Sequence, residues 1–360
     1  MSVVRPVTIR DVARRAGVSL STVSQVLNGR EGYASAETRD RVLAAARELS
    51  YRPNALARGL VTSRTGTLGV VITDITRSFF TQVVSAIEQV ATTHGYSVLL
   101  ACAAGVQLEQ AALETFIDKR VDGIVCMSSS VEASVDHILQ VTRQGVPLVI
   151  INRPLHSSEL HQIAWDDEEI GQRATAHLIG LGHHRIGHLS GLLETPIPGA
   201  PARRAAVDRV TGYRAAMAEA GLPVDESLIV AGGFEYQSAF AACSKMFDRP
   251  DRPTAVFAAS DSMAIAAVNW LHRSHLRVPE DVSVVGANDD LFAIHVEPPL
   301  TTVRPPIAAA GRRAAEQILA AINGKASLEP TREVLHSALV VRASTAPPGG
   351  LADESATDEC

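Results

Sequence analysis

The amino-acid sequence predicts a small all-α helix-turn-helix head joined to an α/β body built from two doubly wound parallel sheets. Three observations lead to this prediction. The first 64 residues are basic whereas the remainder is acidic, and the basic part contains short helical segments separated by a tight turn at Gly17. From about residue 68 onward, β-branched apolar runs such as "LGVVIT" and "VPLVIIN" alternate with amphipathic stretches, which is typical of parallel sheets covered by helices.

Charge is unevenly distributed along the 360-residue chain. Residues 1–64 contain 11 Arg and no Lys against 5 acidic residues, a net charge of +6, whereas the remainder has 22 basic and 34 acidic residues, a net charge of −12. A basic segment on an acidic body indicates a polyanion-binding module attached to a different kind of domain.

Three short helices are predicted in residues 1–50, which we assign to a helix-turn-helix domain. In "TIRDVARRAGVSLSTVSQVLNGR", Thr8 can cap a first helix that ends at Gly17, and Ser19 can cap a second helix that stops near Asn28. A third helix is expected from Ser35 to Ser50, with Ser35 and Thr38 among the possible caps. Two helices joined by a three-residue turn form a helix-turn-helix, although an alanine-rich hairpin that covers an enzyme has the same pattern.

Residues 51–66 are predicted to be a hinge helix and a linker. Pro53 ends the third helix and permits a new short helix, "NALARGL", which the small polar stretch "VTSRTGT" follows. Gly59 within this short helix costs about 1 kcal/mol of helix stability relative to alanine. The hinge helix should therefore depend on its binding partners for folding.

The body is predicted to contain two α/β subdomains. Around eight strand-and-helix units follow the linker, more than one compact doubly wound sheet usually holds. We assign residues 67–342 to the body, with a first subdomain at 67–163 and 307–327 and a second at 164–303 and 328–342. Residues 343–360 are rich in Pro, Gly and acidic side chains and are predicted to be a disordered tail.

Composition excludes several classes of protein. No apolar run approaches the roughly 20 residues of a membrane-spanning helix, so no membrane partner is expected. The N-terminus lacks the pattern of a secretory signal, so we expect a cytoplasmic protein. The four cysteines are widely scattered and are expected to be reduced thiols; they are Cys102, Cys126, Cys243 and Cys360.

The second helix of the head has the side chains of a DNA reader. In a helix-turn-helix this helix lies in the major groove and presents its early residues to base edges. Hydroxyl groups there can bind phosphates or bases, and Gln25 can pair bidentately with adenine. The candidate residues at these positions are Leu20, Ser21, Thr22, Ser24 and Gln25.

Ordered motifs along almost the whole chain resemble those of the lac repressor/galactose repressor (LacI/GalR) family of bacterial transcriptional regulators. They include "VTIRDVARRAGVSLSTVSQVLNG", "SAETRDRVLAAARELSYRPNALARGL", "HLIGLGHHRIGHLSG", "RVTGYRAAM", "VPEDVSVVGANDD" and "PPLTTVRPP". The resemblance covers about residues 7–342. It implies a homodimeric repressor that binds a palindromic operator in double-stranded DNA. It also implies that the body is an effector-binding and dimerisation domain of periplasmic-binding-protein type.

The same resemblance implies roles for residues of the head and hinge. In the family, hinge helices of two subunits pack in the minor groove, and a leucine matching Leu60 wedges between base pairs and kinks the duplex. Members often have arginine where this chain has Gln25, so its operator should differ at the base that this position reads. The predicted DNA-binding residues are Thr8, Ser19, Leu20, Ser21, Thr22, Ser24, Gln25, Asn28, Tyr33, Asn54, Ala57, Arg58 and Leu60.

Polar and aromatic residues just after the apolar runs are the candidates for an effector site. Ligands of open α/β sheets bind beyond the carboxyl ends of strands, which predicts Asp74, Phe79, Phe80, Met127, Ser128, Asn152, Ser260, Asp261, Asn288 and Asp289. The resemblance implies in addition Arg209 as an effector contact, with Phe234 and Trp165 as apolar walls. The alternative for each of these residues is ordinary capping of a strand end.

Two positions depart from the usual pattern of the family. Asn288 stands where an aspartate is common and Ser260 where an asparagine is common, and Asp289 is the alternative source of a carboxylate. A sugar or sugar derivative is the expected effector. The Pro-rich segment at 192–209 is expected either to close over the cleft or to be a surface insertion.

No motif indicates catalysis. The sequence has no G-x-G-x-x-G after the first strand, no phosphate-binding loop and no G-x-S-x-G elbow, so we expect neither an enzyme nor a cofactor. We interpret the four histidines in and before "LGHHRIGHL" as parts of a helix-to-strand junction rather than a metal site. The alternative function is an α/β enzyme with a regulatory DNA-binding head.

Overall fold

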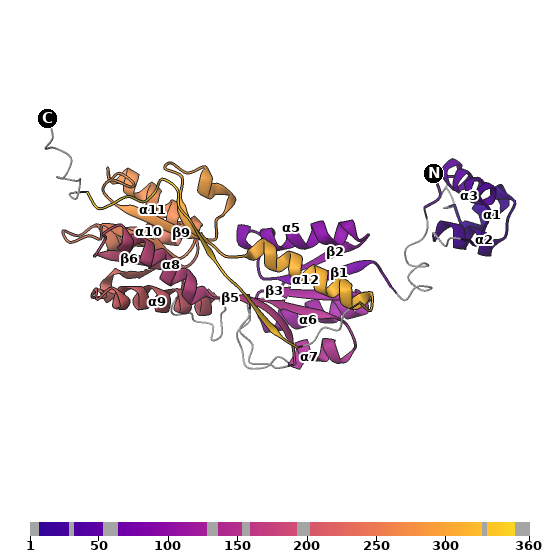
Figure 1. Ribbon diagram of the computed structural model, residues 1–360, viewed down its shortest axis with the longest axis horizontal. Helices are drawn as coiled ribbons and strands as arrows, with labels where there is room; N and C mark the ends of the chain where they lie inside the picture. The colour runs from indigo at the N-terminus through magenta and orange to yellow at the C-terminus, as the bar shows by residue number, and fades with distance from the viewer. Residues whose placement is uncertain are drawn as a thin grey trace, which may run out of the picture. The chain divides into compact units, whose positions relative to one another are not determined.

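The computed structural model (Figure 1) divides the chain into two units, Met1–Gly66 and Thr67–Cys360. It describes residues 7–28, 32–52, 64–127, 136–152, 159–192, 202–325 and 330–349. The predicted hinge residues Asn54, Ala57, Arg58 and Leu60, residues 193–201 of the 192–209 segment and the candidate Ser128 lie outside the described residues.

The head consists of three helices whose ends follow the predicted signals. They are α1 (Ile9–Ala16), α2 (Leu20–Leu27) and α3 (Ala36–Glu48). Gly17 ends α1 in the left-handed conformation at φ 65°, which glycine adopts without steric strain. Ser19 Oγ accepts a hydrogen bond from the Thr22 amide at 3.1 Å, and Ser35 Oγ accepts one from the Thr38 amide at 3.2 Å. Both predicted N-caps are thus confirmed.

A small apolar core joins the three helices of the head. Each helix contributes one fully buried valine, namely Val12, Val23 and Val42. Buried alanines surround them, so the helices approach closely and leave the polar face of α2 outward. The helix-turn-helix is therefore a packed unit in its own right.

The first subdomain of the body is a six-stranded parallel sheet between two layers of helices. Its order is β11-β5-β4-β3-β1-β2. The strands are β1 (Thr67–Ile72), β2 (Ser97–Cys102), β3 (Gly123–Met127), β4 (Leu148–Ile151), β5 (His161–Trp165) and β11 (Arg332–Leu335). Buried residues of α5 (Ser78–Thr93) and α12 (Ile307–Ile322) pack on one face. Those of α6 (Val106–Asp118) and α7 (Asp136–Arg143) pack on the other.

The second subdomain repeats this arrangement in the order β12-β10-β9-β8-β6-β7, with β12 antiparallel to β10. Its strands are β6 (Ile186–Ser190), β7 (Ile229–Ala231), β8 (Ala255–Ala258), β9 (Ser283–Ala287), β10 (Thr301–Arg304) and β12 (Ala338–Val340). Its helices are α8 (Asp167–Gly180), α9 (Ala202–Glu219), α10 (Tyr236–Phe247) and α11 (Asp261–Arg273), with the short turns η1 (Glu226–Leu228) and η2 (Leu291–Ile294). The predicted fold class is confirmed.

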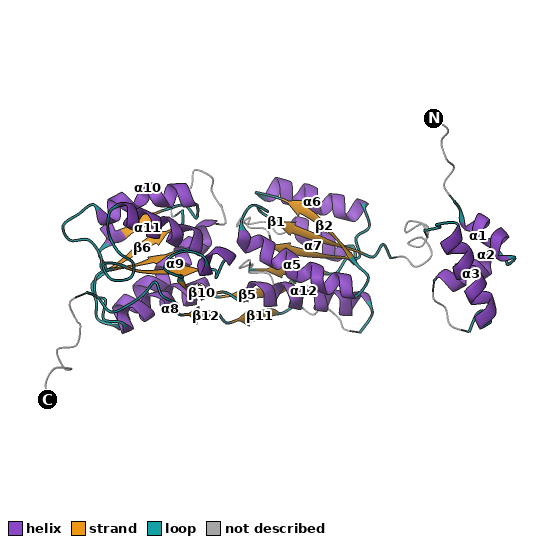
Figure 2. Cartoon of the chain, turned by 90° about the horizontal axis from the view of Figure 1, so that it is seen from above, coloured by secondary structure: helices purple, strands orange, loops and turns teal. Residues whose placement is uncertain are grey.

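The chain passes between the two subdomains along one side of the body. Figure 2 shows β5, β10, β11 and β12 together on this side. The prediction placed residues 328–342 in the second subdomain, but β11 pairs with β5 of the first sheet and only β12 joins the second. Edge strands carry few apolar residues, so composition does not tell which sheet will pair with them.

The segment after β12 is ordered as far as residue 349, which corrects the prediction of a disordered tail from residue 343. Ser344 is fully buried, and its Oγ accepts a hydrogen bond from the Thr301 amide at 2.8 Å and donates one to the Val284 carbonyl oxygen at 2.6 Å. His183 Nε2 lies 2.8 Å from the Ala346 carbonyl oxygen. These contacts satisfy backbone groups at the end of the second sheet, which explains why a Pro-rich segment packs there.

His183 is part of this structural junction. Its Nδ1 lies 2.9 Å from Thr254 Oγ1, so both ring nitrogens have partners. Within the described ranges, no group of histidine, cysteine and acidic side chains is placed to bind a metal ion. None of the helices in the described ranges combines the length and the apolar character that a membrane-spanning helix requires.

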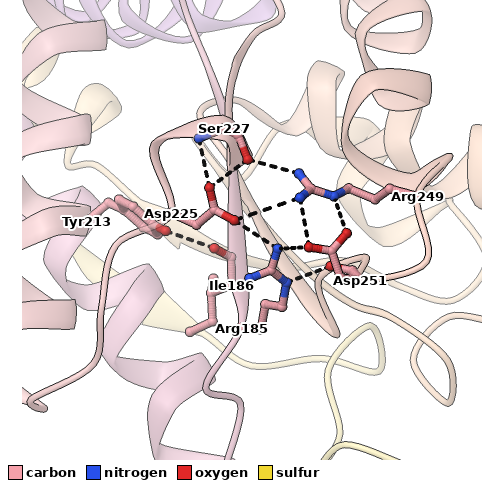
Figure 3. Close-up of polar contacts among 7 residues, drawn as sticks. All are labelled: Arg185, Ile186, Tyr213, Asp225, Ser227, Arg249 and Asp251. Carbon is pink, nitrogen blue, oxygen red and sulfur yellow. Dashed lines mark hydrogen bonds and ion pairs between the residues drawn. The ribbon is translucent and has the colours of Figure 1, made fainter.

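A polar network ties the amino ends of the strands of the second sheet (Figure 3). Arg185, just before β6, contacts Asp225 at 2.8 Å and Asp251 at 2.8 Å. Arg249 contacts Asp251 at 2.7 Å and donates to Ser227 Oγ at 2.9 Å. Single exposed ion pairs contribute about 0–1 kcal/mol, but a network shares the entropic cost of ordering its side chains. The network lies at the opposite end of the second sheet from the candidate effector residues, which follow the carboxyl ends of the strands.

Helices α8 and α9 pack so closely that their backbones are in contact. A Cβ atom added at Gly171 would lie 2.1 Å from the Arg209 carbonyl oxygen, and one at Gly212 would lie 2.0 Å from the Glu168 carbonyl oxygen. Only glycine permits this approach at both positions. The crossing sets the position of Arg209, which belongs to α9.

Replacing Gly171 with alanine is expected to destabilise the protein, because the added methyl group meets a helix backbone that cannot move aside. Overpacking of this kind typically lowers the free energy of unfolding by about 1–3 kcal/mol. At Gly180 of the same helix, a Cβ would have no heavy atom within 4 Å, so Gly180→Ala is a matched control that should keep or slightly raise stability. Urea unfolding measures both variants, and equal midpoints for the two would contradict the packing argument.

Candidate DNA-binding and effector sites

The second helix of the head presents a polar face to solvent. Ser19, Leu20 and Ser21 are exposed, Thr22, Ser24 and Gln25 are half-buried, and Val23 and Val26 face the core. No residue of α2 is charged, so its outer face can approach bases without having to remove a strongly hydrated group.

Arginines around α2 supply positive charge. The exposed arginines on the described part of the head are Arg10, Arg14, Arg15, Arg39, Arg41, Arg47 and Arg52. Arg15 contacts Glu48 at 2.7 Å, but both side chains remain more than half exposed. Arg15 can therefore exchange this weak ion pair for a contact with a phosphate group. This arrangement gives a basic surround to a polar, uncharged reading face.

Two predicted DNA contacts have a structural role in the head. The Thr8 hydroxyl donates to Asp11 Oδ2 at 2.7 Å, and the Thr8 amide donates to the same oxygen at 2.9 Å. Ser19 Oγ caps α2 and also lies 2.8 Å from Ser21 Oγ. Both side chains orient the turn before the reading face. Asn28 at the end of α2 and Tyr33 after it are exposed, with Tyr33 at 52%.

A cleft of about 1940 Å³ lies at the carboxyl ends of the strands of both sheets. It contains most of the predicted effector residues, although they come from loops far apart in sequence. Those that line it are Asp74, Phe79, Phe80, Met127, Asn152, Trp165, Arg209, Phe234, Ser260 and Asn288. The position of these side chains agrees with the general rule for ligand sites in open α/β sheets.

Arg209 is held at the cleft by contacts on three sides. Its Nε and Nη2 donate to Asp167 Oδ1 at 3.0 and 2.8 Å, and its Nη1 donates to the Ala259 carbonyl oxygen. The guanidinium lies 5.9 Å from the centre of the Phe234 ring. The residue is only 3% exposed, so its orientation is fixed before any ligand arrives. Asp167 was not among the predicted site residues. The acidic first turn of α8, directly after β5, is the feature of the sequence that could have indicated it.

Aromatic rings form walls on both sides of the cleft. In the first subdomain, the Phe79 ring packs edge-on against Trp165, with 5.8 Å between the ring centres. In the second, Phe234 has φ 62° and its ring lies over Gly191, where an added Cβ would meet it at 2.0 Å. Asn152 and Asn288 also have positive φ values, 48° and 111°. Backbone strain at non-glycine residues concentrates at functional sites, and these three residues all line the cleft.

Two residues that line the cleft each have a buried polar side-chain atom without a hydrogen-bond partner. Among the described residues, Trp165 Nε1 and Asn288 Oδ1 are both buried and unpaired. One is a donor and the other an acceptor. Leaving such groups unpaired costs about 1–3 kcal/mol each, so a molecule that pairs with both would gain binding free energy.

Two of the predicted residues that line the cleft cap loops or helices, as the alternative interpretation expected. Asp74 Oδ1 accepts from the Thr76 hydroxyl at 2.7 Å and from the Thr76 amide at 2.9 Å, and these hydrogen bonds lower the pKa of the carboxyl group. Ser260 Oγ caps α11 by accepting from the Met263 amide at 3.4 Å. Both still reach the cleft, so capping and ligand contact are compatible for them.

Asp261 and Asp289 do not line the cleft, which corrects their assignment. Asp289 turns away and contacts Arg304 at 2.6 Å and Arg342 at 2.5 Å. Its neighbour Asp290 lines the cleft instead and accepts a hydrogen bond from Gln82 of α5 at 3.4 Å, while burial raises the pKa of its carboxyl group. Positive φ at residues 288 and 289 turns the chain so that the side chains do not alternate as in a strand.

Asp261 supports this loop from beneath. It is fully buried, and its oxygens accept from the Thr302 hydroxyl at 2.6 Å and from the Asp290 amide at 2.6 Å. Burial raises the pKa of the Asp261 carboxyl group to about 7. The side chain thus fixes the backbone that carries Asn288 and Asp290.

Known proteins resemble the chain in both units. The family model of bacterial regulatory proteins of the lacI family matches residues 8–54, and that of a periplasmic binding protein-like domain matches residues 175–345. The HTH-type transcriptional repressor PurR of Vibrio atlanticus (strain LGP32) is 37% identical over 319 residues, which are 88% of this chain and 92% of the relative.

Solved structures resemble the chain over almost its full length. The transcriptional regulator CelR in a complex with cellobiose has 35% identity and a TM-score of 0.66, covering 94% of this chain and 100% of its own. The lac repressor dimer bound to operator and the anti-inducer ONPF has 28% identity and a TM-score of 0.81, covering 95% of this chain and 100% of its own.

Replacing Asp261 with asparagine is expected to reduce the pH dependence of stability between pH 4 and 7. The native pKa of about 7 lies above the ordinary value of 3.8, so the native state keeps a proton that the unfolded chain loses in this interval. The stabilisation that comes from the protonated Asp261 carboxyl group is therefore complete below pH 4 and is lost as the pH rises to 7. Urea unfolding at pH 4.5 and 7 measures this loss in both proteins.

Asp281→Asn is the control, because Arg277 holds the pKa of Asp281 at about 2, below the interval measured. In Asp281→Asn, the free energy of unfolding should decrease between pH 4.5 and 7 by the same amount as in the wild type. An equal decrease of stability with pH in wild type and Asp261→Asn would show that Asp261 does not titrate in the native protein.

Proposed function

Because the chain belongs to the lacI family of bacterial regulatory proteins and is a DNA-binding transcriptional repressor, we propose that it binds a palindromic operator as a homodimer. We also propose that a small polar molecule, a sugar or a sugar derivative, binds in the cleft and controls operator binding. Each part is supported by a separate set of side chains.

The reading face of α2 supports the assignment of base contacts. Its exposed and half-buried positions carry hydroxyl groups, the apolar Leu20 and one amide, Gln25, while arginines surround it. Gln25 is the residue with the donor and acceptor pair that adenine requires. We assign the remaining predicted head residues to phosphate contacts and to orientation of the helix.

Exposed apolar side chains on the body support association with a second copy of the chain. Leu291 and Ile294 of η2 are 68% and 51% exposed, and Phe292 between them is 65% exposed. Phe292 also lines the cleft, so Leu291 and Ile294 are the apolar residues of this turn that favour burial against a partner. Two copies related by a two-fold axis would present two heads to two operator half-sites.

The unpaired Trp165 Nε1 and Asn288 Oδ1 are the observation that carries the effector assignment. Trp165 and Asn288 both line the cleft, together with Arg209 and with aromatic walls from both subdomains. Asp290 and Gln82 come from different subdomains and are in contact, so a change in the angle between subdomains would alter this contact. An effector regulates operator binding only if its affinity differs between two such arrangements.

Selection from a random duplex pool by the full chain should yield a palindromic site. In Gln25→Ala, preference at one base pair in each half-site should weaken by about 1–3 kcal/mol, because the bidentate contact is lost. Gel shifts at fixed salt concentration on all four bases at that position measure the effect. Glu48→Gln, on the exposed Arg15 pair, is the control and should keep the wild-type preference. A selected site without two-fold symmetry, or an unchanged preference in Gln25→Ala, would contradict the proposal.

Asn288→Gly should lose effector affinity about tenfold to a hundredfold while keeping operator binding, because a buried acceptor is removed from the cleft. The φ of 111° suits glycine, and no internal hydrogen bond of Oδ1 is lost. Arg209→Ala is a less direct test, since it also leaves Asp167 without its ion pair in a buried site. A thermal-shift screen of sugars, sugar phosphates and purines identifies the effector, and titration of operator complexes measures the response.

His275→Gly is the matched control, because His275 also has a positive φ, 59°, and does not line the cleft. It should respond to the effector as the wild type does. If Asn288→Gly did the same, the assignment of the cleft as the effector site would be wrong.

A further inference from the structure

The cleft extends beyond the compartment around Arg209 toward its mouth. The segments that cross between the two subdomains adjoin β5 and β11 at one edge of the first sheet and β10 and β12 at one edge of the second. The strands at the opposite edges are β2 and β7. The segments that follow these two outer strands also line the cleft. They contribute Gln107 and Leu108 at the start of α6 and Glu235 and Tyr236 at the start of α10. An outer compartment therefore lies between the starts of α6 and α10.

Tyr236 forms a fixed aromatic surface in this outer compartment. Its ring is stacked on Phe240, with 6.2 Å between ring centres and 18° between ring planes. Its hydroxyl oxygen accepts a hydrogen bond from Asn269 Nδ2 at 3.0 Å. The ring is therefore held from its apolar and its polar ends, although the residue is 37% exposed. An exposed aromatic side chain with so restricted an orientation is suited to stacking on a ligand ring.

The opposite wall adds an apolar and an amide side chain. Leu108 is 55% exposed at the start of α6, next to Gln107, and both line the same cleft as Tyr236. Arg77 and Glu235 come within 4.0 Å of each other across the cleft, so the two walls approach at this level. An aromatic face, an aliphatic side chain and amide groups together suit a ring that has one apolar face and polar edges.

Charge in the cleft disfavours anions. Of the described residues that line it, eight are acidic, four are arginines and none is lysine. Arg204 is paired with Asp208 at 2.7 Å and Arg209 with Asp167 at 2.8 Å, so both charges are already compensated. A phosphate or carboxylate ligand would enter a cleft of net negative charge. An uncharged polar ligand avoids this repulsion.

The size of the cleft indicates more than one ring. Its volume of about 1940 Å³ exceeds the roughly 300–1,000 Å³ of an ordinary small-molecule pocket. Phe234 of the inner compartment and Tyr236 of the outer one are two residues apart, which separates their backbones by at most about 7 Å. Neighbouring rings of one ligand can therefore contact both residues.

On the basis of the function proposed above, we propose that the effector is an uncharged saccharide of at least two rings. The inner ring pairs with Trp165 Nε1 and Asn288 Oδ1, beside Arg209. The second ring stacks on Tyr236 and faces Leu108. Tyr236 thereby makes the site selective for a disaccharide over its constituent monosaccharides.

Isothermal titration of the full chain with a defined panel tests this proposal. The panel contains cellobiose, maltose, lactose, sucrose and trehalose, their monosaccharides, glucose 6-phosphate, and the purines guanine and hypoxanthine. At least one disaccharide should bind about tenfold more tightly than either of its monosaccharides, the effect of one added stacked ring. Tyr236→Ala should reduce this preference to within about twofold, and Tyr236→Phe, which keeps the ring, should retain it.

Three results would overturn the proposal: binding of none of the disaccharides, tighter binding of a monosaccharide, sugar phosphate or purine, or an equal loss of all affinities in Tyr236→Ala. Circular dichroism of the variants separates the last result from unfolding. A purine that released operator DNA in an Asn288-dependent manner would refute the two-ring ligand and leave the regulatory function intact. A disaccharide that bound with the expected dependence on Tyr236 but left operator binding unchanged would refute effector control instead.

Discussion

The backbone contact between α8 and α9 is the constraint on which the candidate effector site depends. Gly171 and Gly212 allow these helices to approach so closely that an added Cβ atom would overlap the facing backbone, and the crossing places the Arg209 guanidinium against Asp167 and the Ala259 carbonyl oxygen. Because Arg209 is almost completely buried, its direction is set by this packing and not by a ligand. The aromatic ring of Phe234 and the amide of Asn288 then complete a site whose guanidinium group is already in place.

A second constraint is that the cleft belongs to two sheets at once. The first subdomain contributes Phe79 and Trp165, and the second contributes Phe234 and Asn288. Since the chain crosses between the sheets along one side only, the opposite side of the cleft is bounded by the loops after β2 and β7. A ligand that contacts both walls favours one angle between the sheets, which is the physical requirement for a regulator that responds to a small molecule.

Polar side chains hold the loops that make this site. Asp261 accepts hydrogen bonds from the Thr302 hydroxyl and the Asp290 amide, and Asp289 forms ion pairs with Arg304 and Arg342. At the far end of the second sheet, Ser344 and His183 attach the last described segment, and the Arg185 network joins the amino ends of the strands. These contacts restrict the loops without involving Trp165 Nε1 or Asn288 Oδ1, which have no hydrogen-bond partner among the described residues.

The sequence by itself determined the features that depend on neighbours within a turn or two of the chain. The caps at Ser19 and Ser35, the left-handed turn at Gly17, and the alternation of strands and helices all follow from local hydrogen bonding and hydrophobic periodicity. Motif resemblance located Arg209 and Asn288 in the cleft as well.

Only the tertiary structure decided that β11 joins the first sheet, that residues 343–349 pack on the second, and that Asp290 rather than Asp289 faces the cleft. It also brought Tyr236 next to Asn269, 33 residues away. Each of these outcomes depends on hydrogen bonds or backbone rotations that join distant segments. Such contacts leave no periodic pattern in the sequence, because their partners are chosen by the packing of the completed sheets.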